Sequence, residues 1–228
     1  MKKLLNGILE FRQKYHDHYI ENFSHLALGQ FPDTLFIACS DSRVVPNLFA
    51  STNPGDLFVV RNVGNMIPRY QQTHACLGTA EAAAIEFSLT NLPISNIIVC
   101  GHSECAAMQA IVSGVDQIED PFLRSWLANT EGLNSSPEYE LDFDSELTIQ
   151  NRTSQLNVLH QMSHLKTYPI VNQKIESGNL QIHGWYFDIA KGDVYGYEQE
   201  FKKFILIDEV EAKRICARLD HAEFNCFH

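Results

Sequence analysis

The first half of the chain alternates short apolar runs with segments of helical composition, and no other feature constrains the fold as strongly. The apolar runs predict strands at residues 34–39, 57–61 and 96–100. Helices are predicted at 78–89, which is rich in alanine, and at 103–112, with Ser103 as the N-cap. Strands that alternate with helices in this order pair in parallel. We therefore predict an α/β fold with a mostly parallel central β-sheet flanked by helices.

The second half adds one long helix and a group of strands. A helix is predicted at 148–166 and another at 208–221. Between them, a strand over 180–189 turns at Lys191-Gly192-Asp193 into a strand over 194–197, and a short strand follows at 204–207. No repeat, low-complexity tract or flexible linker interrupts the sequence. We predict one domain over residues 1–228, with a C-terminal hairpin extension.

The segment ahead of the first strand is amphipathic. Apolar side chains recur near helical spacing at Leu4, Ile8, Phe11, Tyr15, Tyr19, Phe23 and Leu26. They predict an N-terminal helical arm over residues 1–28. A helix outside the main sheet needs a cover for its apolar side. Two covers fit the sequence equally well, namely the rest of the same chain and a second subunit.

Soft metal ligands stand at two of the predicted strand ends. Cys39 ends the run that begins at Leu35, and His102 and Cys105 follow the run Ile97-Ile98-Val99. Ligands of parallel sheets bind outside the carboxyl ends of the strands, so the fold can bring these three side chains together. Cys105 also lies near a helix N-terminus, where the dipole favours a thiolate. The sequence therefore predicts a zinc site built from two cysteines and one histidine.

Two charged residues close to the first ligand suggest a catalytic role for this site. Three protein ligands leave a position for water, whereas a structural zinc ion takes four, and Asp41 is the one available fourth ligand. An ionised Asp41 can instead accept a hydrogen bond from zinc-bound hydroxide, while the planar guanidinium of Arg43 holds it off the metal. Because two thiolates weaken the metal as a Lewis acid, we expect the pKa of bound water to exceed the value of ~7 found for three-histidine zinc. The activity should then rise through the alkaline range.

The other candidate ligands are interpreted as structural or remain open. Cys100 lies inside a predicted strand, so we assign it to the core. Cys226 and His228 resemble a ligand pair, but they stand at the end of the chain without partners nearby in the sequence. His74 is one candidate for a proton shuttle among ten histidines. Six scattered cysteines do not predict a disulfide scaffold in a chain of this length.

The charge and hydropathy patterns exclude several classes of partner. A formal net charge of −11 argues against nucleic acid and against anionic membranes. Residues 113–150 hold nine acidic side chains and one basic side chain, which gives −8 of that charge, and we interpret the segment as solvated surface. No apolar run approaches the ~20 residues of a membrane span. Polar residues from Asn6 to Arg12 also interrupt any signal peptide, so we expect a cytoplasmic protein.

These motifs resemble those of the β-class carbonic anhydrases over residues 30–207. The matching segments are 39–43 (Cys-Ser-Asp-Ser-Arg), 54–62 (Pro-Gly-Asp-Leu-Phe-Val-Val-Arg-Asn), 101–105 (Gly-His-Ser-Glu-Cys) and 183–185 (His-Gly-Trp). The resemblance implies one zinc ion per subunit on Cys39, His102 and Cys105, with Asp41 and Arg43 as the catalytic pair. It also implies a homodimer, or a tetramer or octamer built from dimers, whose N-terminal helices lie on the partner subunit.

Within the family, the chain looks most like the plant-type subclass, whose zinc is usually open to water. Gln30 matches a glutamine that contacts substrate, and Phe58 and Val63 match an apolar pocket. Phe87 replaces a frequent tyrosine and Ala106 a frequent glycine, which changes the substrate cleft but leaves the backbone N–H of residue 106 available to a substrate oxygen. Another subclass has tryptophan at the position of Phe36 and forms a noncatalytic bicarbonate site with it, so we expect no such site here.

The resemblance implies the zinc-dependent, reversible hydration of CO2 to bicarbonate and a proton, by attack of zinc-bound hydroxide. Two alternatives stay open. One is a hydrolase of CS2 or carbonyl sulfide on the same fold, because these substrates are also linear and apolar. The other is a noncatalytic, zinc-stabilised binding protein, which would tolerate the loss of Asp41.

Overall fold

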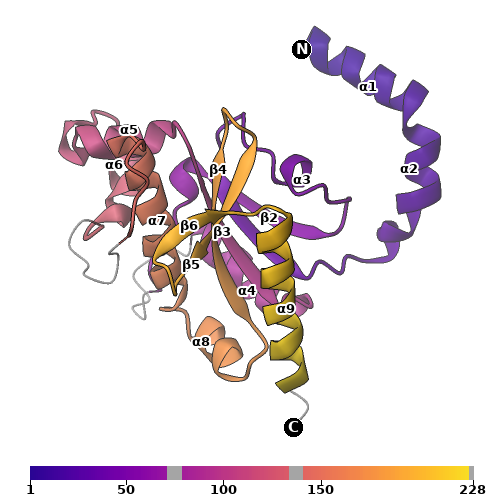
Figure 1. The fold of residues 1–228 in the computed structure, drawn as a ribbon. Coiled ribbons are helices and arrows are strands. Elements are labelled where there is room, and N and C mark those ends of the chain that lie inside the picture. Colours follow the sequence, from indigo (N-terminus) through magenta and orange to yellow (C-terminus); the bar gives the residue numbers. More distant parts are fainter. Residues whose placement is uncertain (71–78, 134–140, 226–228) are drawn as a thin grey trace.

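A computed structural model describes residues 1–70, 79–133 and 141–225 of the chain (Figure 1). Its elements, in order, are α1 (Lys2–Lys14), α2 (His16–Phe23), η1 (Ser24–Leu28), β1 (Thr34–Cys39), α3 (Pro46–Phe49), β2 (Leu57–Asn62), η2 (Val63–Asn65), α4 (Ala80–Asn91), β3 (Asn96–His102), α5 (Ala106–Ser113), η3 (Val115–Gln117), α6 (Pro121–Leu127), η4 (Ala128–Thr130), α7 (Ile149–Leu165), α8 (Pro169–Glu176), β4 (Gln181–Asp188), β5 (Asp193–Glu198), β6 (Lys203–Leu206) and α9 (Glu209–Asn225).

The six strands form one sheet in the order β2-β1-β3-β4-β5-β6. The strands β2, β1, β3 and β4 are parallel, and β5 and β6 are antiparallel to their neighbours. The turn between β4 and β5 contains Gly192 with a φ of 73°, a conformation that favours glycine. The predicted fold class and the C-terminal hairpin are therefore confirmed. Because β1 and β3 are neighbours, the strand ends that carry Cys39 and His102 lie side by side.

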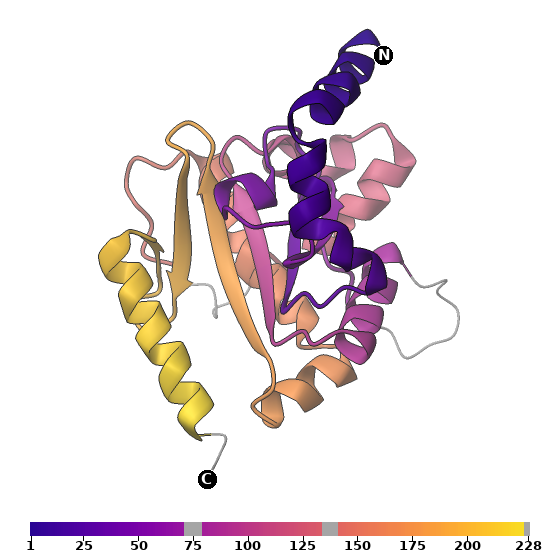
Figure 2. The same ribbon diagram turned by 90° about the vertical axis from the view of Figure 1, so that its right-hand side faces the viewer.

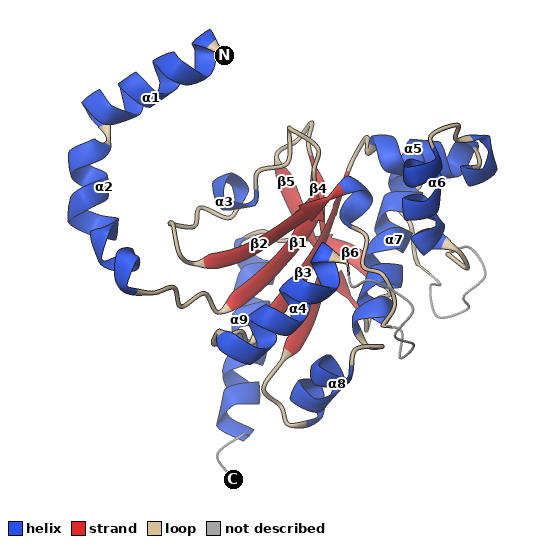
Figure 3. Cartoon of the chain, turned by 180° about the vertical axis from the view of Figure 1, so that it is seen from behind, coloured by secondary structure: helices blue, strands red, loops and turns tan. Residues whose placement is uncertain are grey.

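Helices cover both faces of the sheet (Figures 2 and 3). Alternate side chains of β1 point to opposite faces, as the pleat requires. Leu35 and Ile37 belong to the larger core, together with side chains of α4, α7 and α8. Phe36 and Ala38 belong to a smaller core on the other face, where Phe49 of α3 packs. Helix α9 also lies on this second face, over side chains of β3 and β4.

The structure differs from the sequence prediction mainly in short helices. The predicted helix at 103–112 begins at Ala106 instead, with Cys105 as its N-cap. Ser103 is not its cap, because the Ser103 hydroxyl accepts a hydrogen bond from the N–H of Ile189 at 2.9 Å. Three further helices, α3, α6 and α8, were not predicted; each begins at a proline, a residue favoured in the first helical turn. The described acidic side chains of 113–150 are all exposed, as predicted.

The N-terminal arm projects away from the sheet (Figure 1). Neither α1 nor α2 contains a buried residue. Leu4 is 68% exposed and Ile8 is 62% exposed, so the apolar side of the arm has no cover within the described chain. Among the helices that the structure describes, the arm included, none is long and apolar enough to cross a membrane.

Candidate metal site

Three buried side chains converge at the carboxyl ends of β1 and β3. The ligand atoms of Cys39, His102 and Cys105 all lie within 4.8 Å of one another. Cys39 is the last residue of β1, His102 is the last residue of β3, and Cys105 stands directly before α5. Two sulfurs and one imidazole at this separation can hold a single zinc ion. The structure thus brings together the three ligands that the sequence predicted.

The hydrogen bonds of His102 leave one ring nitrogen free for a metal. Its Nδ1 lies 2.8 Å from the carbonyl oxygen of Ser103, so Nδ1 carries the proton and donates it. Its Nε2 is buried and has no hydrogen-bond partner among the described residues. A buried nitrogen with an unused lone pair is costly unless something binds it. This arrangement is the one that metal-binding histidines adopt, with the second nitrogen fixed by an acceptor.

The two thiols share one proton in the absence of a cation. The hydrogen bond from Cys105 lowers the pKa of Cys39 to about 4, with a further contribution from the N–H of Gly64. The same hydrogen bond and burial raise the pKa of Cys105, while the N–H groups of Met108 and Ala107 act against that rise. A thiolate is therefore already present at neutral pH. A divalent cation binds such a pair by displacing the remaining proton.

An ion pair lies beside the cluster. Arg43 donates from Nε to one oxygen of Asp41 at 2.9 Å and from Nη2 to the other at 2.7 Å. This two-point contact is the main reason that the pKa of Asp41 lies well below its ordinary value. The carboxylate is ionised and mostly buried, and Arg43 contacts it in the two-point geometry in which Arg binds carboxylates most strongly.

The loop that carries Cys39 and Asp41 is fixed by the end of β2. Arg61 donates to the carbonyl of Cys39 at 3.0 Å and to the carbonyl of Asp41 at 2.7 Å. The N–H of Gly64 points at the Cys39 sulfur from 3.4 Å. Gly64 has a φ of 77°, and a Cβ there would lie 2.9 Å from the side chain of Met66. Only glycine fits this position without strain.

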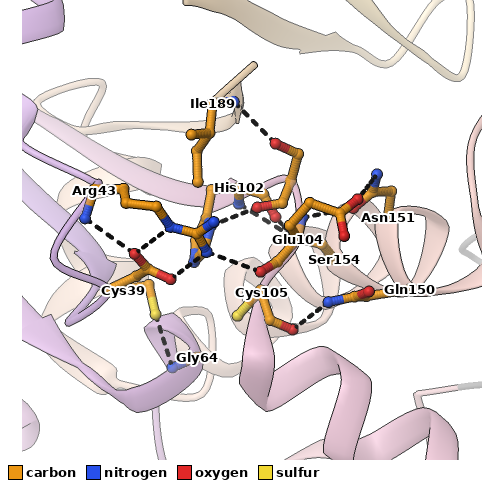
Figure 4. Close-up of polar contacts among 12 residues, drawn as sticks. Cys39, Arg43, Gly64, His102, Glu104, Cys105, Gln150, Asn151, Ser154 and Ile189 are labelled. Carbon is orange, nitrogen blue, oxygen red and sulfur yellow. Dashed lines mark hydrogen bonds and ion pairs between the residues drawn. The ribbon is translucent and has the colours of Figure 1, made fainter.

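Polar side chains of α7 fix the second ligand loop (Figure 4). The Ser154 hydroxyl bonds to both the N–H and the carbonyl of His102, and Gln150 donates to the carbonyl of Cys105 at 2.9 Å. Asn157 donates to the carbonyl of Gly64 at 3.0 Å. No site role was predicted for the residues of α7. A signal was present in the buried polar residues of this helix, which interrupt any apolar stripe.

Two of the five predicted substrate-binding residues lie at the metal end of the sheet. Val63 directly follows β2, whose last residue pairs with Cys39, and its side chain is 43% exposed. Trp126 of α6 holds this position by donating to the Val63 carbonyl at 2.8 Å. Ala106 is the first residue of α5, next to Cys105, and is exposed. Both can therefore face a ligand bound beside the cluster.

The other three, Gln30, Phe58 and Phe87, lie at the opposite end of the sheet, and we call them the distal group. Phe58 pairs with Leu35, four residues before Cys39, which separates it from the metal end by ~13 Å along the strand. Phe87 packs against it, with ring centroids 6.0 Å apart. Gln30 precedes β1 and is exposed. Within one chain, the register of β1 and β2 separates Phe58 and its neighbour Phe87 from Val63, so these three side chains do not form one continuous apolar surface there.

The remaining candidates are partly described. Cys100 is fully buried in the smaller core beside Phe36, as predicted, and burial raises its pKa. It is not part of the ligand cluster. The predicted roles of His74, Cys226 and His228 fall outside the described residues.

Fold and site together define an α/β protein with a candidate metal site at the carboxyl edge of a parallel sheet. A family model described as carbonic anhydrase matches residues 34–194. A carbonic anhydrase of Synechocystis sp. is 37% identical over 211 residues, which span 90% of this chain and 74% of that protein.

Solved structures agree with this match. The β-carbonic anhydrase CcaA superposes with a TM-score of 0.79 at 37% identity, over 90% of this chain and 98% of that one. One of two β-carbonic anhydrases of Sordaria macrospora, described as tetrameric, gives a TM-score of 0.69 at 28% identity, over 85% and 96% of the two chains. The chain belongs to the carbonic anhydrase family, and its fold is that of the β class.

Proposed function

We propose that this chain catalyses the reversible hydration of CO2 to bicarbonate and a proton, with one zinc ion per subunit on Cys39, His102 and Cys105. One observation carries the proposal: three buried soft ligands lie within 4.8 Å of one another, beside an ionised aspartate held by arginine. Zinc, when bound there, supplies a Lewis acid that activates water at neutral to alkaline pH. A reducing compartment such as the cytoplasm would keep both ligand thiols available.

Asp41 and Arg43 orient the reaction. The ionised Asp41 is an acceptor only, so it fixes the hydrogen of the attacking group and aims a lone pair at the carbon of CO2. Arg43 keeps that carboxylate charged and turned to the substrate side. The N–H of Ala106, at the free N-terminus of α5, can donate to a substrate oxygen as negative charge develops on it. Val63 presents an apolar surface suited to a linear, apolar gas.

The distal group reaches a metal only if it belongs to another subunit. We propose a homodimer in which Gln30, Phe58 and Phe87 of each chain cover the metal end of its partner. The apolar arm supports this arrangement, because α1 and α2 bury no residue within their own chain. So does the description of the Sordaria relatives as tetrameric. Phe87 is 47% exposed, a large apolar surface to leave in water.

Metal analysis joined to stopped-flow CO2 hydration tests the activity. We expect one zinc per subunit and rapid turnover in the wild-type protein, with turnover lost but zinc retained in Asp41→Ala. CO2 hydration that survives in Asp41→Ala would overturn the mechanism. If the wild-type protein hydrates no CO2 either, the noncatalytic alternative is favoured. Turnover of carbonyl sulfide in parallel with CO2 separates the hydrolase alternative.

Mixing subunits tests the shared site. Asp41→Ala damages the metal end, and Phe58→Ala damages the distal group. A dimer with one chain of each kind contains one site with both changes and one site with neither. We expect a mixture of the two inactive variants to regain up to about half the activity per mixed dimer. A mixture as inactive as its components would show that each chain completes its own site.

A further inference from the structure

The backbone between the second and third ligands has an unusual conformation. Glu104, between His102 and Cys105, has a φ of 54°, in the left-handed region that residues with a Cβ rarely adopt. Such a residue keeps this conformation only where its surroundings hold it. The hydrogen bonds of Glu104 join it to two places, the first turn of α7 and the Asp41–Arg43 pair.

On one side, Asn151 forms two hydrogen bonds with Glu104 (Figure 4). The side-chain oxygen of Asn151 accepts from the N–H of Glu104 at 2.8 Å, and its amide nitrogen donates to the Glu104 carboxylate at 3.1 Å. Asn151 is itself fixed, because the hydroxyl of Thr148 accepts from its N–H at 3.2 Å and caps α7. Asn151 therefore holds Glu104 from the N-terminus of α7, which is itself fixed by its N-cap.

On the other side, the carbonyl of Glu104 accepts a hydrogen bond from Nη2 of Arg43 at 3.1 Å. The same Nη2 donates to Asp41 at 2.7 Å. Among the described residues, Glu104 is the one hydrogen-bond acceptor for the Arg43 side chain besides Asp41 itself. The left-handed turn is what aims this carbonyl at the guanidinium. Without it, Arg43 and Asp41 would orient each other but would have no fixed point on the second ligand loop.

We propose that Asn151 is a positioning residue for the Asp41–Arg43 pair and acts through the left-handed peptide of Glu104. This inference rests on the proposed function for its activity readout but not for its structural one. Gln150 provides a contrast from the same turn, because it donates to the carbonyl of Cys105 and, among the described residues, forms no hydrogen bond with Glu104 or Arg43. Two neighbouring side chains of α7 thus have separable tasks, one toward the catalytic pair and one toward a ligand.

The test compares Asn151→Ala with Asn172→Ala, an exposed helical asparagine of α8 that also bonds to a backbone carbonyl. We expect Asn151→Ala to lower kcat by about 10-fold to 100-fold, the usual range for residues that orient a metal site, while KM and zinc content stay unchanged. Asn172→Ala should change none of the three. Added to Arg43→Ala, Asn151→Ala should lower kcat no further, because Arg43→Ala has already removed the side chain that connects Glu104 to Asp41.

A rescue variant keeps the proposal distinct from a general loss of structure. Glycine adopts positive φ without strain, so Glu104→Gly added to Asn151→Ala should recover part of the lost kcat. An unchanged kcat in Asn151→Ala, loss of zinc from it, or an equal further loss on top of Arg43→Ala would each overturn the proposal.

Crystal structures of wild type and Asn151→Ala give a readout that does not depend on activity. We expect the two-point contact of Arg43 with Asp41 and the bond to Glu104 in the wild type, and their loss in the variant. If the wild type hydrates no CO2, the proposed function fails, but this comparison still decides the positioning role. An Arg43 in the same place in both structures would overturn it.

Discussion

The two ends of the parallel sheet differ in how complete they are within one chain. At the carboxyl end, each candidate ligand is held by a hydrogen bond from β2 or α7, and His102 is fully buried. At the other end, the distal group and the arm expose large apolar side chains, including Phe87 and Leu4. The side chains of the first region are held by contacts within the chain, whereas those of the second are exposed and apolar, as at an interface between subunits.

The difference separates two kinds of determinant. Metal binding needs three atoms held within a few ångströms, and local loops on adjacent strands supply them. The proposed substrate site needs an apolar enclosure, and the register of β1 and β2 places Phe58 too far from the metal end to close such an enclosure within one chain.

The largest effect is expected from a ligand. Cys39→Ser replaces a thiolate by a hydroxyl that stays protonated at neutral pH, so the zinc is lost and CO2 hydration falls to the uncatalysed rate. Metal analysis and stopped-flow measurements check this. Cys216→Ser, which changes an exposed thiol of α9, should keep both zinc and activity. Full occupancy and turnover in Cys39→Ser would show that the cluster is not the metal site.

A large but incomplete loss is expected from the catalytic pair. Asp41→Asn keeps the shape of the side chain but removes its charge and turns an acceptor into a partial donor. We expect kcat to fall by about 10²-fold to 10⁴-fold with zinc retained, the range for a positioned acid–base group. Asp56→Asn, in an exposed turn, is the matched control. A loss of zinc in Asp41→Asn would instead favour a ligand role for this carboxylate.

Much of the carboxyl end of the sheet could be predicted from the sequence, because its candidate ligands lie in or directly after short apolar segments that are easily recognised. Cys39 and His102 each end an apolar run, and adjacency of β1 and β3 needs only the usual parallel topology. The cap at Ser103 was wrong for a physical reason. The turn at Glu104 must first reverse the chain so that Cys105 faces the other ligands, which delays the helix to Ala106.

The supporting contacts of α7 could not be predicted. Asn151 and Ser154 lie about fifty residues beyond the loop that they hold, and only the packing of α7 on β3 creates the contact. The division of the substrate residues was missed for a similar reason. Gln30, Phe58 and Phe87 have the right residue types, but the strand register decides which end of the sheet they occupy.

The distal end is tested through the arm. Ile8→Asp places a charge on the exposed apolar side of α1, whereas Lys14→Ala changes only an exposed ion pair on the same helix. If the arm packs on a second subunit, Ile8→Asp should raise the dimer dissociation constant by about 30-fold, as expected for the loss of ~2 kcal/mol at an interface anchor. Sedimentation velocity over a dilution series measures this. Equal dissociation constants for the two variants would leave the arm without a role in assembly.

The smallest effect concerns how α7 holds the segment that follows η2. His164 donates from Nδ1 to the carbonyl of Ile67 and accepts from Arg69, and burial lowers its pKa to about 4. The unfolded chain titrates near 6.5, so between the two values the unfolded state binds more protons, and stability falls as pH falls. From pH 7 to pH 5 the loss should be on the order of 1–2 kcal/mol in the free energy of unfolding. His164→Gln should remove that part of the pH dependence in urea unfolding, and His25→Gln, in the exposed η1, should not. An unchanged pH dependence in His164→Gln would mean that the charged form is tolerated beside Arg69, and that α7 holds this segment through its other polar contacts.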